Sequence, residues 1–319
     1  MTHPPSAEFL NLSARCGQNP LRVQGPGGNT SAKSGDTMWI KASGTELADA
    51  EVKPIFVEVD LAAARAEATG AGDGSCKDTV IDPAIRLRPS IETTFHAILD
   101  WAVVVHTHSI ATLTHMVGPT GLAAARQKLD GLPFASVPYR KPGLPLTREI
   151  IAQITPETQI ILLANHGLIV AGADVAGVAA LMEEVETRLS MPPLAAPAPA
   201  PETAAPEGYD WHPAAARLAM DPRLTSLSLA GSYYPDHVVF LGPALPQSPV
   251  ATSPALMVPG QGIAVKHEAT PAQRAMVQCL SDLLTRLPPD WEPDPIGPEA
   301  EQSLLNWDAE KYRQALAAR

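Results

Sequence analysis

Cysteine is scarce in this sequence, and the few cysteines lie far apart. Cys16, Cys76 and Cys279 are the only three among 319 residues, and no two are spaced as C-x-x-C. An odd number of widely separated cysteines argues against a disulfide framework or a cysteine-based metal or redox motif, and suits a reducing compartment. The N-terminal residues also lack the basic and then apolar stretches of a secretory signal. We therefore expect a cytoplasmic protein.

Long apolar runs and an excess of positive charge are lacking as well. No apolar run approaches the roughly 20 residues that span a bilayer, so we expect no membrane segment. The formal net charge is −11, and such a surface repels phosphate backbones, so we expect no nucleic-acid partner. The hydrophobic content of 45% is enough for a sizeable folded core.

Proline, by contrast, is concentrated in one segment. Residues 191–207 contain six Pro and six Ala in seventeen positions. Proline blocks helix formation and favours extended, semi-rigid chain. We therefore predict a linker at 191–208, between a first domain of residues 1–190 and a smaller module of residues 209–319.

Hydrophobic periodicity predicts an α/β first domain in which strands and helices mix. We expect strands at 38–43, 101–108 and 159–170, and helices at 92–101, 147–154 and 174–189. In the second module we expect a buried strand at 236–243, an amphipathic helix at 270–287 and a short helix at the end of the chain.

Two histidines end the Val-rich strand predicted at 101–108. His106 and His108 are two residues apart, and side chains at i and i+2 point to the same face of a strand. Two imidazoles in this arrangement can converge on one ion, and a catalytic zinc usually has three protein ligands and an open position. The pair alone is equally compatible with two histidines that simply sit at a strand end.

A third histidine, His166, interrupts the apolar run at 159–170 and is followed by Gly167. Glycine allows a close backbone approach or an unusual turn at this point. A polar group at the end of a buried strand needs a partner, and a metal ion would be one. Taken alone, His166 is better explained by a core histidine bound to a backbone carbonyl.

Glu92 opens the helix that precedes the strand with His106 and His108. A carboxylate at a helix N-terminus is stabilised by the helix dipole, which would make it only a capping feature. Next to a metal and partly desolvated, the same carboxylate can exchange a proton with a substrate carbon. His96 lies one helical turn further on and is a weaker candidate, as a further ligand or a neighbour of the ligands.

Two glycine-containing, hydroxyl-rich turns lie at 25–33 and 41–45. Exposed backbone N–H groups in such turns can bind an anion, with hydrogen bonds added by Asn29, Thr30, Ser31, Ser43 and Thr45. Ser90 precedes the helix of Glu92 and can donate to the same anion. Taken alone, each segment is better explained as an ordinary tight turn.

Taken together, five motifs resemble the class II aldolase/adducin head family. They are GGNTS, WIKASGT, SIETTFH, VVHTH and LLANHGLI, and they occur in this order within residues 10–190. The resemblance implies a three-layer α/β/α domain with a central, mostly antiparallel sheet. It also implies a homotetramer with active sites at subunit contacts.

The resemblance further implies roles for single residues. His106, His108 and His166 match the family's zinc ligands, and Glu92 matches its catalytic carboxylate. Asn29, Ser43, Gly44 and Ser90 match positions that hold a substrate phosphate. Ile91 departs from the pattern, because a small hydroxyl residue often follows the position of Ser90. The implied activity is zinc-dependent cleavage of a ketose 1-phosphate, of the rhamnulose or fuculose type, to dihydroxyacetone phosphate and an aldehyde.

The C-terminal module is similar to part of another group. YYPDHVVFLGP (233–243) and NWDAEKYRQ (306–314) resemble the aldolase half of bifunctional rhamnulose-1-phosphate aldolase/alcohol dehydrogenase proteins. No G-x-G-x-x-G fingerprint follows, so we expect the aldolase half without the dehydrogenase half. A separate dehydrogenase that acts on the aldehyde product is a conceivable partner.

Three alternatives stay open at this point. Pentulose-phosphate 4-epimerases share the fold and metal site that the resemblance implies. They tend to carry Asp at the position of Glu92, which favours the aldolase. Decarboxylases of sugar-acid phosphates use the same kind of zinc site. An adducin-like head that serves only for assembly would not need the three histidines and the carboxylate.

Overall fold

The computed structural model describes residues 5–193, 198, 201 and 203–318. Its largest element is a seven-stranded sheet with the strand order β3-β2-β1-β4-β7-β6-β5. All neighbouring strands are antiparallel except β5 and β6, which are parallel. This confirms the mostly antiparallel sheet. The strands are β1 (Asn29–Ser34), β2 (Thr37–Lys41), β3 (Phe56–Asp60), β4 (Val103–Thr107), β5 (Ala135–Val137), β6 (Ile160–Leu163) and β7 (Gly167–Gly172).

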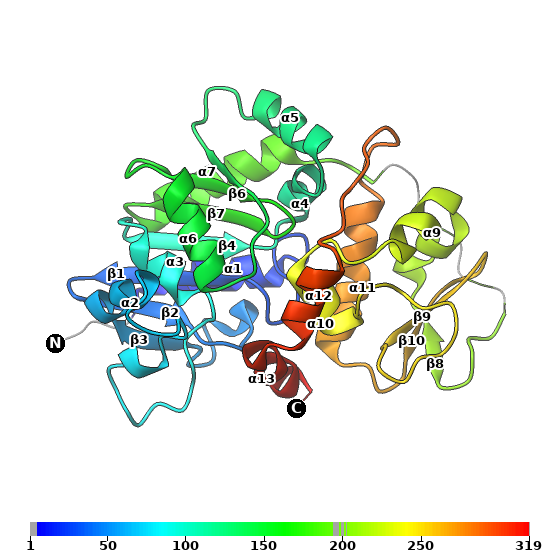
Figure 1. Cartoon of the computed structure of the whole chain (residues 1–319), viewed down its shortest axis with the longest axis horizontal. Helices are drawn as coiled ribbons and strands as arrows, with labels where there is room; N and C mark the ends of the chain where they lie inside the picture. Colours follow the sequence, from blue (N-terminus) through cyan, green and yellow to red (C-terminus); the bar gives the residue numbers. More distant parts are fainter. Residues whose placement is uncertain (1–4, 194–197, 199–200, 202, 319) are drawn as a thin grey trace.

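Helices cover both faces of this sheet, so the first part of the chain has three layers (Figure 1). The central strand β4 shows the reason: Val103 and Val105 join one apolar cluster with α1 and α7, whereas Val104 joins another with α3 and α6. Alternate residues of one strand thus enter opposite layers. The helices are α1 (Ala7–Gln18), α2 (Leu61–Ala68), α3 (Thr93–Ile98), α4 (Ile110–Met116), α5 (Pro119–Lys128), α6 (Leu144–Gln153) and α7 (Val175–Leu189). Two single-turn 3₁₀ helices, Leu47–Asp49 and Lys77–Thr79, lie between them.

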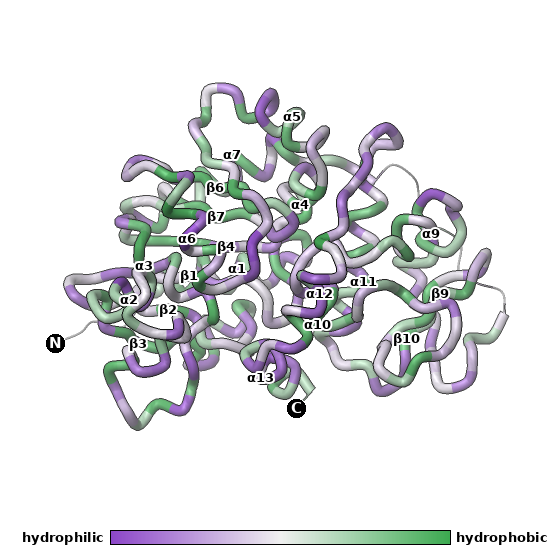
Figure 2. Tube along the Cα trace, viewed as in Figure 1, coloured by the Kyte–Doolittle hydropathy of each residue, from purple (hydrophilic) through white to green (hydrophobic). Residues whose placement is uncertain are grey.

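The strand predicted at 159–170 is two strands. β6 and β7 form an antiparallel pair in which Leu163 lies opposite Gly167, so Ala164, Asn165 and His166 make the turn. Asn165 adopts a left-handed backbone conformation, with φ of 53°. All four residues of β6 are buried, and the strand forms a continuous hydrophobic segment (Figure 2). The turn thus places His166 at the edge of the core rather than inside a strand.

Residues 209–318 form a smaller α/β portion with a three-stranded antiparallel sheet in the order β8-β10-β9. The helix predicted at 270–287 is confirmed as α11, which begins with a capping box between Thr270 and Gln273. The elements are β8 (Tyr209–Trp211), a 3₁₀ turn (Pro213–Ala215), α8 (Arg217–Met220), α9 (Pro222–Leu229), α10 (Pro235–Leu241), β9 (Ala255–Val258), β10 (Gly262–Lys266), α11 (Pro271–Leu284), α12 (Pro298–Leu305) and α13 (Asp308–Ala317).

The buried strand predicted at 236–243 was wrong, because this segment is the helix α10. Pro235 occupies the first turn, where its fixed φ favours a helix and its missing N–H is not needed. Every residue from Pro235 to Leu241 is buried. A short run that is apolar on all sides has no periodicity to separate a buried helix from a buried strand.

The smaller portion packs directly on the first. Ile110 and Leu113 of α4, and Val117 directly after it, share one apolar cluster with residues of α10 and α11. In addition, the side-chain amide of Asn165 donates to the carbonyls of Tyr233 and Asp294, at 3.1 and 2.8 Å. Part of the linker predicted at 191–208 lies outside the described residues. None of the described helices has the length and hydrophobicity that crossing a membrane requires.

Candidate metal centre and active site

Three histidines meet at one end of the central sheet. His106 is in β4, His108 follows β4, and His166 lies in the turn between β6 and β7. Since β4 and β7 are paired, with Thr107 opposite Leu168, the turn is held beside the end of β4. One ring nitrogen from each histidine lies within 4.8 Å of the others, and all three residues are buried. The structure therefore brings together the three side chains that the sequence predicted would meet.

The surroundings leave ring nitrogens free to bind a cation. His106 Nδ1 lies 3.0 Å from the Leu168 carbonyl, so it donates there and Nε2 keeps its lone pair. Burial lowers the pKa of His106 to about 4 and that of His166 to about 3. Both rings are therefore neutral near pH 7, as a metal ligand must be.

Gly167 makes the approach of the two strands possible. A Cβ atom at this position would lie 2.2 Å from the Thr107 carbonyl oxygen, and φ is 156°. Any side chain would push the turn of His166 away from His106 and His108. The glycine next to His166 is thus explained by close backbone approach, one of the two reasons that the sequence offered.

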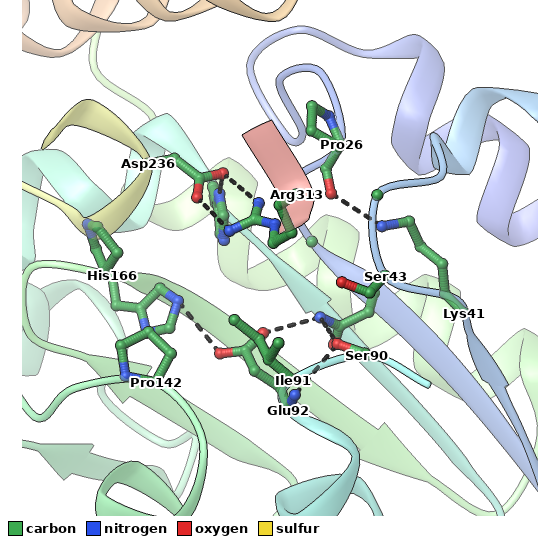
Figure 3. A pocket seen from close by; sticks show the side chains of 15 residues that line it. Pro26, Lys41, Ser43, Ser90, Ile91, Glu92, Pro142, His166, Asp236 and Arg313 are labelled. Carbon is green, nitrogen blue, oxygen red and sulfur yellow. Dashed lines mark hydrogen bonds and ion pairs between the residues drawn. The ribbon is translucent and has the colours of Figure 1, made fainter. Parts of the chain in front are cut away.

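Glu92 lies beside two of these histidines. Its Oε1 is 3.4 Å from His166 Nε2 (Figure 3), and its Oε2 is 3.5 Å from His106 Nε2. Burial raises the pKa of Glu92, but His106, His166 and the hydrogen bond from Asn29 outweigh this effect, so the pKa lies below its usual value. Glu92 is the N-cap of α3 but makes no capping hydrogen bond with its side chain, so its carboxylate faces the histidines instead.

A chain of hydrogen bonds fixes the carboxylate of Glu92. Asn29 donates from its Nδ2 to Glu92 Oε2 at 2.8 Å and to Ser90 Oγ at 3.1 Å. The Asn29 Oδ1 is 2.5 Å from His96 Nε2, and His96 Nδ1 is 2.7 Å from Ser31 Oγ. His96 therefore orients the Asn29 amide with its N–H groups toward Glu92. His96 lies behind the site and is absent from the histidine cluster.

The predicted anion-binding residues line one pocket beside Glu92. Asn29, Ser43, Gly44 and Ser90 all border it, together with Ile91. Two backbone hydrogen bonds join the turn at 41–45 to residues 88–90. Ser43 N donates to the Arg88 carbonyl, and Ser90 N donates to the Lys41 carbonyl. The buried Ser43 hydroxyl has no hydrogen-bond partner among the described residues. It is therefore a donor available to a ligand.

The other hydroxyls of the two turns point elsewhere. Thr30 pairs with Ser13 at 2.7 Å, Ser31 pairs with His96, and Thr45 donates to the Ala42 carbonyl at 2.8 Å. These three residues support the loops and do not line the pocket.

Sequence reasoning missed Lys41, which also lines this pocket. Its Nζ is buried and donates to the Pro26 carbonyl at 2.9 Å (Figure 3). Burial, with Arg313 nearby, lowers the pKa of Lys41 to about 7. A lysine at the inner end of a largely apolar strand was a usable signal, because lysine is almost never fully buried without a role or a partner.

Two further residues of the pocket, Asp236 and Arg313, come from α10 and α13. Asp236 Oδ2 lies 3.4 Å from His108 Nδ1, and Arg313 pairs with Asp236 at 2.9 and 3.1 Å. Burial raises the pKa of Asp236, but Arg313 and His108 outweigh it, so the pKa lies well below its usual range. The segments 233–243 and 306–314, which contain Asp236 and Arg313, were singled out from the sequence only for their resemblance to other proteins. Neither residue was assigned a role at the metal, since both lie at least 70 positions from the histidines.

The donor set fits a divalent cation such as zinc. Three neutral imidazoles with a carboxylate nearby are ligands that zinc prefers. Two buried atoms at the centre of the cluster, His106 Nε2 and Glu92 Oε1, have no hydrogen-bond partner among the described residues. Both are electron-pair donors, and a cation between them would satisfy both.

Comparison with known proteins identifies a family and several similar proteins. Residues 11–191 match the family described as class II aldolase and adducin N-terminal domain. The chain is 30% identical over 161 residues to an uncharacterized oxidoreductase, YuxG, of Bacillus subtilis. That match covers 46% of this chain but only 23% of the relative.

The chain is also similar to solved structures. The N-terminal class II aldolase domain of a conserved protein from Thermoplasma acidophilum is 25% identical, with a TM-score of 0.50. The match covers 59% of this chain and 94% of that chain. An L-fuculose-1-phosphate aldolase from Thermus thermophilus matches at 17% identity over 57% of this chain and 92% of that one, with a TM-score of 0.38. Because the family match spans more than half of its residues, this chain belongs to the class II aldolase and adducin N-terminal domain family.

Proposed function

We propose that this protein is a zinc-dependent aldolase that cleaves a ketose 1-phosphate to dihydroxyacetone phosphate and an aldehyde. The observation that carries the proposal is the cluster of His106, His108 and His166, whose ring nitrogens lie within 4.8 Å of one another, with Glu92 at 3.4 and 3.5 Å from two of the rings. An assembly module would not require this buried combination, which favours an enzyme over an adducin-like scaffold.

The three histidines would hold the metal. Zinc, when bound, supplies a Lewis acid that polarises the carbonyl and hydroxyl oxygens of the substrate and offsets the charge that develops as the carbon–carbon bond breaks. Glu92 is the group that moves the proton: in the cleavage direction it delivers a proton to the enediolate carbon, and in the reverse direction it removes it. The Asn29 amide keeps the Glu92 carboxylate pointed toward the substrate.

The neighbouring pocket would bind the substrate phosphate. Asn29, Ser43, Gly44 and Ser90 supply hydrogen-bond donors, and the buried Lys41 adds a positive charge that a phosphate dianion would stabilise. Holding the phosphate at one end fixes the reacting carbons relative to Glu92. Ile91 supplies no hydroxyl here, so Lys41 takes a larger share of phosphate binding.

The remaining assignments are also proposals. We expect a homotetramer in the cytoplasm, a first domain of residues 1–190, a linker at 191–208 and a module of residues 209–319. A separate dehydrogenase that acts on the aldehyde product is a further proposed partner.

Product analysis tests the proposal directly. The zinc-loaded protein is incubated with a panel of ketose 1-phosphates and, in parallel, with the free sugars. We expect two fragments, one of which is dihydroxyacetone phosphate. A single isomeric product would indicate a 4-epimerase, and released carbon dioxide from a sugar-acid phosphate would indicate a decarboxylase. A protein that binds no zinc and converts none of these would contradict the enzyme assignment.

A further inference from the structure

We propose that Asp236 is a positioning residue of the metal centre, which fixes the ring of His108, and that Arg313 holds Asp236 in place. Both residues lie outside the segment that matches the family, residues 11–191. The inference rests on the proposed zinc site, and it means that the C-terminal portion of the chain completes the site.

The position of Asp236 gives the first argument. Its Oδ2 lies 3.4 Å from His108 Nδ1, and both side chains are almost fully buried, at 1% and 6% exposure. With Nδ1 facing this carboxylate, Nε2 is the ring nitrogen of His108 that is left for an ion. A carboxylate at the outer nitrogen of a ligating histidine fixes its tautomer and orientation and makes the other nitrogen more basic.

Arg313 gives the second argument. Its guanidinium reaches Asp236 through two nitrogens, Nη1 to Oδ1 at 2.9 Å and Nη2 to Oδ2 at 3.1 Å (Figure 3). This fork-to-fork geometry sets the plane of the carboxylate as well as its position. The same Nη1 contacts both carboxylate oxygens of Glu310, at 2.8 and 3.1 Å. Glu310 thus holds Arg313, and Arg313 contacts both oxygens of Asp236, including the Oδ2 that faces His108.

The third argument is the cost of burying these charges. A buried ion pair contributes little net stability, because desolvation offsets most of the attraction. The helices that carry these residues have other anchors: α10 is buried along its whole length, and α13 places Tyr312 under Arg88, with the guanidinium 4.2 Å from the ring centre. Because the fold does not depend on this pair alone, its place against His108 points to a role at the metal.

Zinc affinity measured separately from turnover tests the inference. The full-length protein is stripped of metal, and zinc binding is measured by competition with a chromophoric chelator for the wild type and for Asp236→Asn. Asparagine keeps the shape but removes the charge that aligns His108, so we expect zinc to bind about 10–100-fold more weakly. The visible absorption spectrum of the cobalt-substituted protein should shift as well, because the ligand field changes.

Glu310→Gln is the matched control. It removes a buried carboxylate that binds the same Arg313, and no contact between Glu310 and the three histidines exists among the described residues. We expect its zinc affinity and cobalt spectrum to equal those of the wild type. If Asp236→Asn does not fold, as judged by circular dichroism, Arg313→Lys takes its place. Because lysine has one side-chain nitrogen, it cannot bind both oxygens of Asp236 in the way that Arg313 does, and we expect several-fold weaker zinc binding.

The outcomes separate this inference from the proposed function. Suppose that Asp236→Asn, or its replacement Arg313→Lys, folds and keeps the wild-type zinc affinity and cobalt spectrum. This result would overturn the role of Asp236 and leave the aldolase proposal standing. An equal loss of zinc affinity in Glu310→Gln would also overturn it, since the effect would then follow from any charge lost in the cluster. A wild-type protein that binds no zinc would overturn both.

Discussion

Replacing Glu92 by Gln changes one functional group at the centre of the site and little else. Glutamine has the size of glutamate, and its carbonyl oxygen can still accept the hydrogen bond that Asn29 Nδ2 makes to Glu92 Oε2 at 2.8 Å. The carboxamide cannot take up a proton at neutral pH. The substitution therefore removes proton transfer while keeping the packing of a side chain that is only 3% exposed.

The expected loss follows from the role of a general acid or base. Such a group contributes about 10²–10⁴-fold to a rate, which corresponds to about 2.7–5.4 kcal/mol in activation free energy. We expect Glu92→Gln to lose turnover by this factor and to bind zinc through the three histidines. The steady-state rate is measured by a coupled assay for the triose phosphate, and zinc content by elemental analysis of the same preparation.

Glu58→Gln is the control for this experiment. Glu58 lies in β3, is 8% exposed and does not line the pocket, so the same chemical change there should leave turnover at the wild-type level. Wild-type turnover of zinc-loaded Glu92→Gln would refute the reasoning. A rate lost equally in both variants would show that the change acts through folding and not through proton transfer.

Three further predictions concern the phosphate pocket, the strand contact and pH. Lys41→Met should weaken binding of a phosphorylated substrate by about 10–150-fold, which corresponds to about 1.5–3 kcal/mol for a charged hydrogen bond. Binding of an unphosphorylated analogue should change little, so equal effects on the KM values of both substrates would contradict the prediction. Gly167→Ala should lower the unfolding free energy by at least about 2 kcal/mol in urea titrations, because its Cβ would lie 2.2 Å from the Thr107 carbonyl. The control Gly35→Ala is also at positive φ but has open space around it, so it should lower the unfolding free energy less. The metal-free protein should lose about 5 kcal/mol of unfolding free energy between pH 6.5 and 5.5, about 1 kcal/mol for each of five buried histidines. The unfolded chain takes up protons on these histidines near pH 6.5, whereas in the folded protein burial lowers the pKa of His106 and His115 to about 4, that of His166 and His237 to about 3, and that of His96 well below its usual value. Urea titrations in chelator that show no such loss would be inconsistent with neutral buried rings.

The parts of the site that local rules control could be predicted from the sequence. His106 and His108 share a face because side chains alternate along a strand, and the glycine after His166 indicated a close backbone approach. The mostly antiparallel sheet was expected from the family resemblance of five ordered motifs. Each of these inferences uses residues that are neighbours in sequence or motifs that occur in a fixed order.

The missed features depend on contacts between distant segments. Asp236 and Arg313 reach the pocket only because α10 and α13 pack against the first portion of the chain, and no spacing rule links position 313 to position 108. Lys41 enters the pocket from the end of β2, where its amine meets the carbonyl of the distant Pro26. The helix α10 was predicted as a strand for a related reason. Burial on every side removes the polar face that would have shown a helical period.

The site also shows why a residue type alone does not assign a role. His96 lies in the same helix as Glu92 and was a weak candidate for the metal, yet its two ring nitrogens are used by Asn29 and Ser31. Thr30 and Thr45 belong to the hydroxyl-rich turns, yet they bond to Ser13 and to a backbone carbonyl. Only the three-dimensional contacts separate ligands from the groups that support them.

The most direct test of the central claim is X-ray absorption at the zinc edge of the purified wild-type protein, with zinc titrations of the wild type and of His166→Ala. We predict one zinc per chain, three imidazole nitrogens at about 2.0–2.1 Å, and loss of tight binding in the variant. Sulfur ligands at the zinc, or tight binding that survives in His166→Ala, would contradict a metal held by His106, His108 and His166.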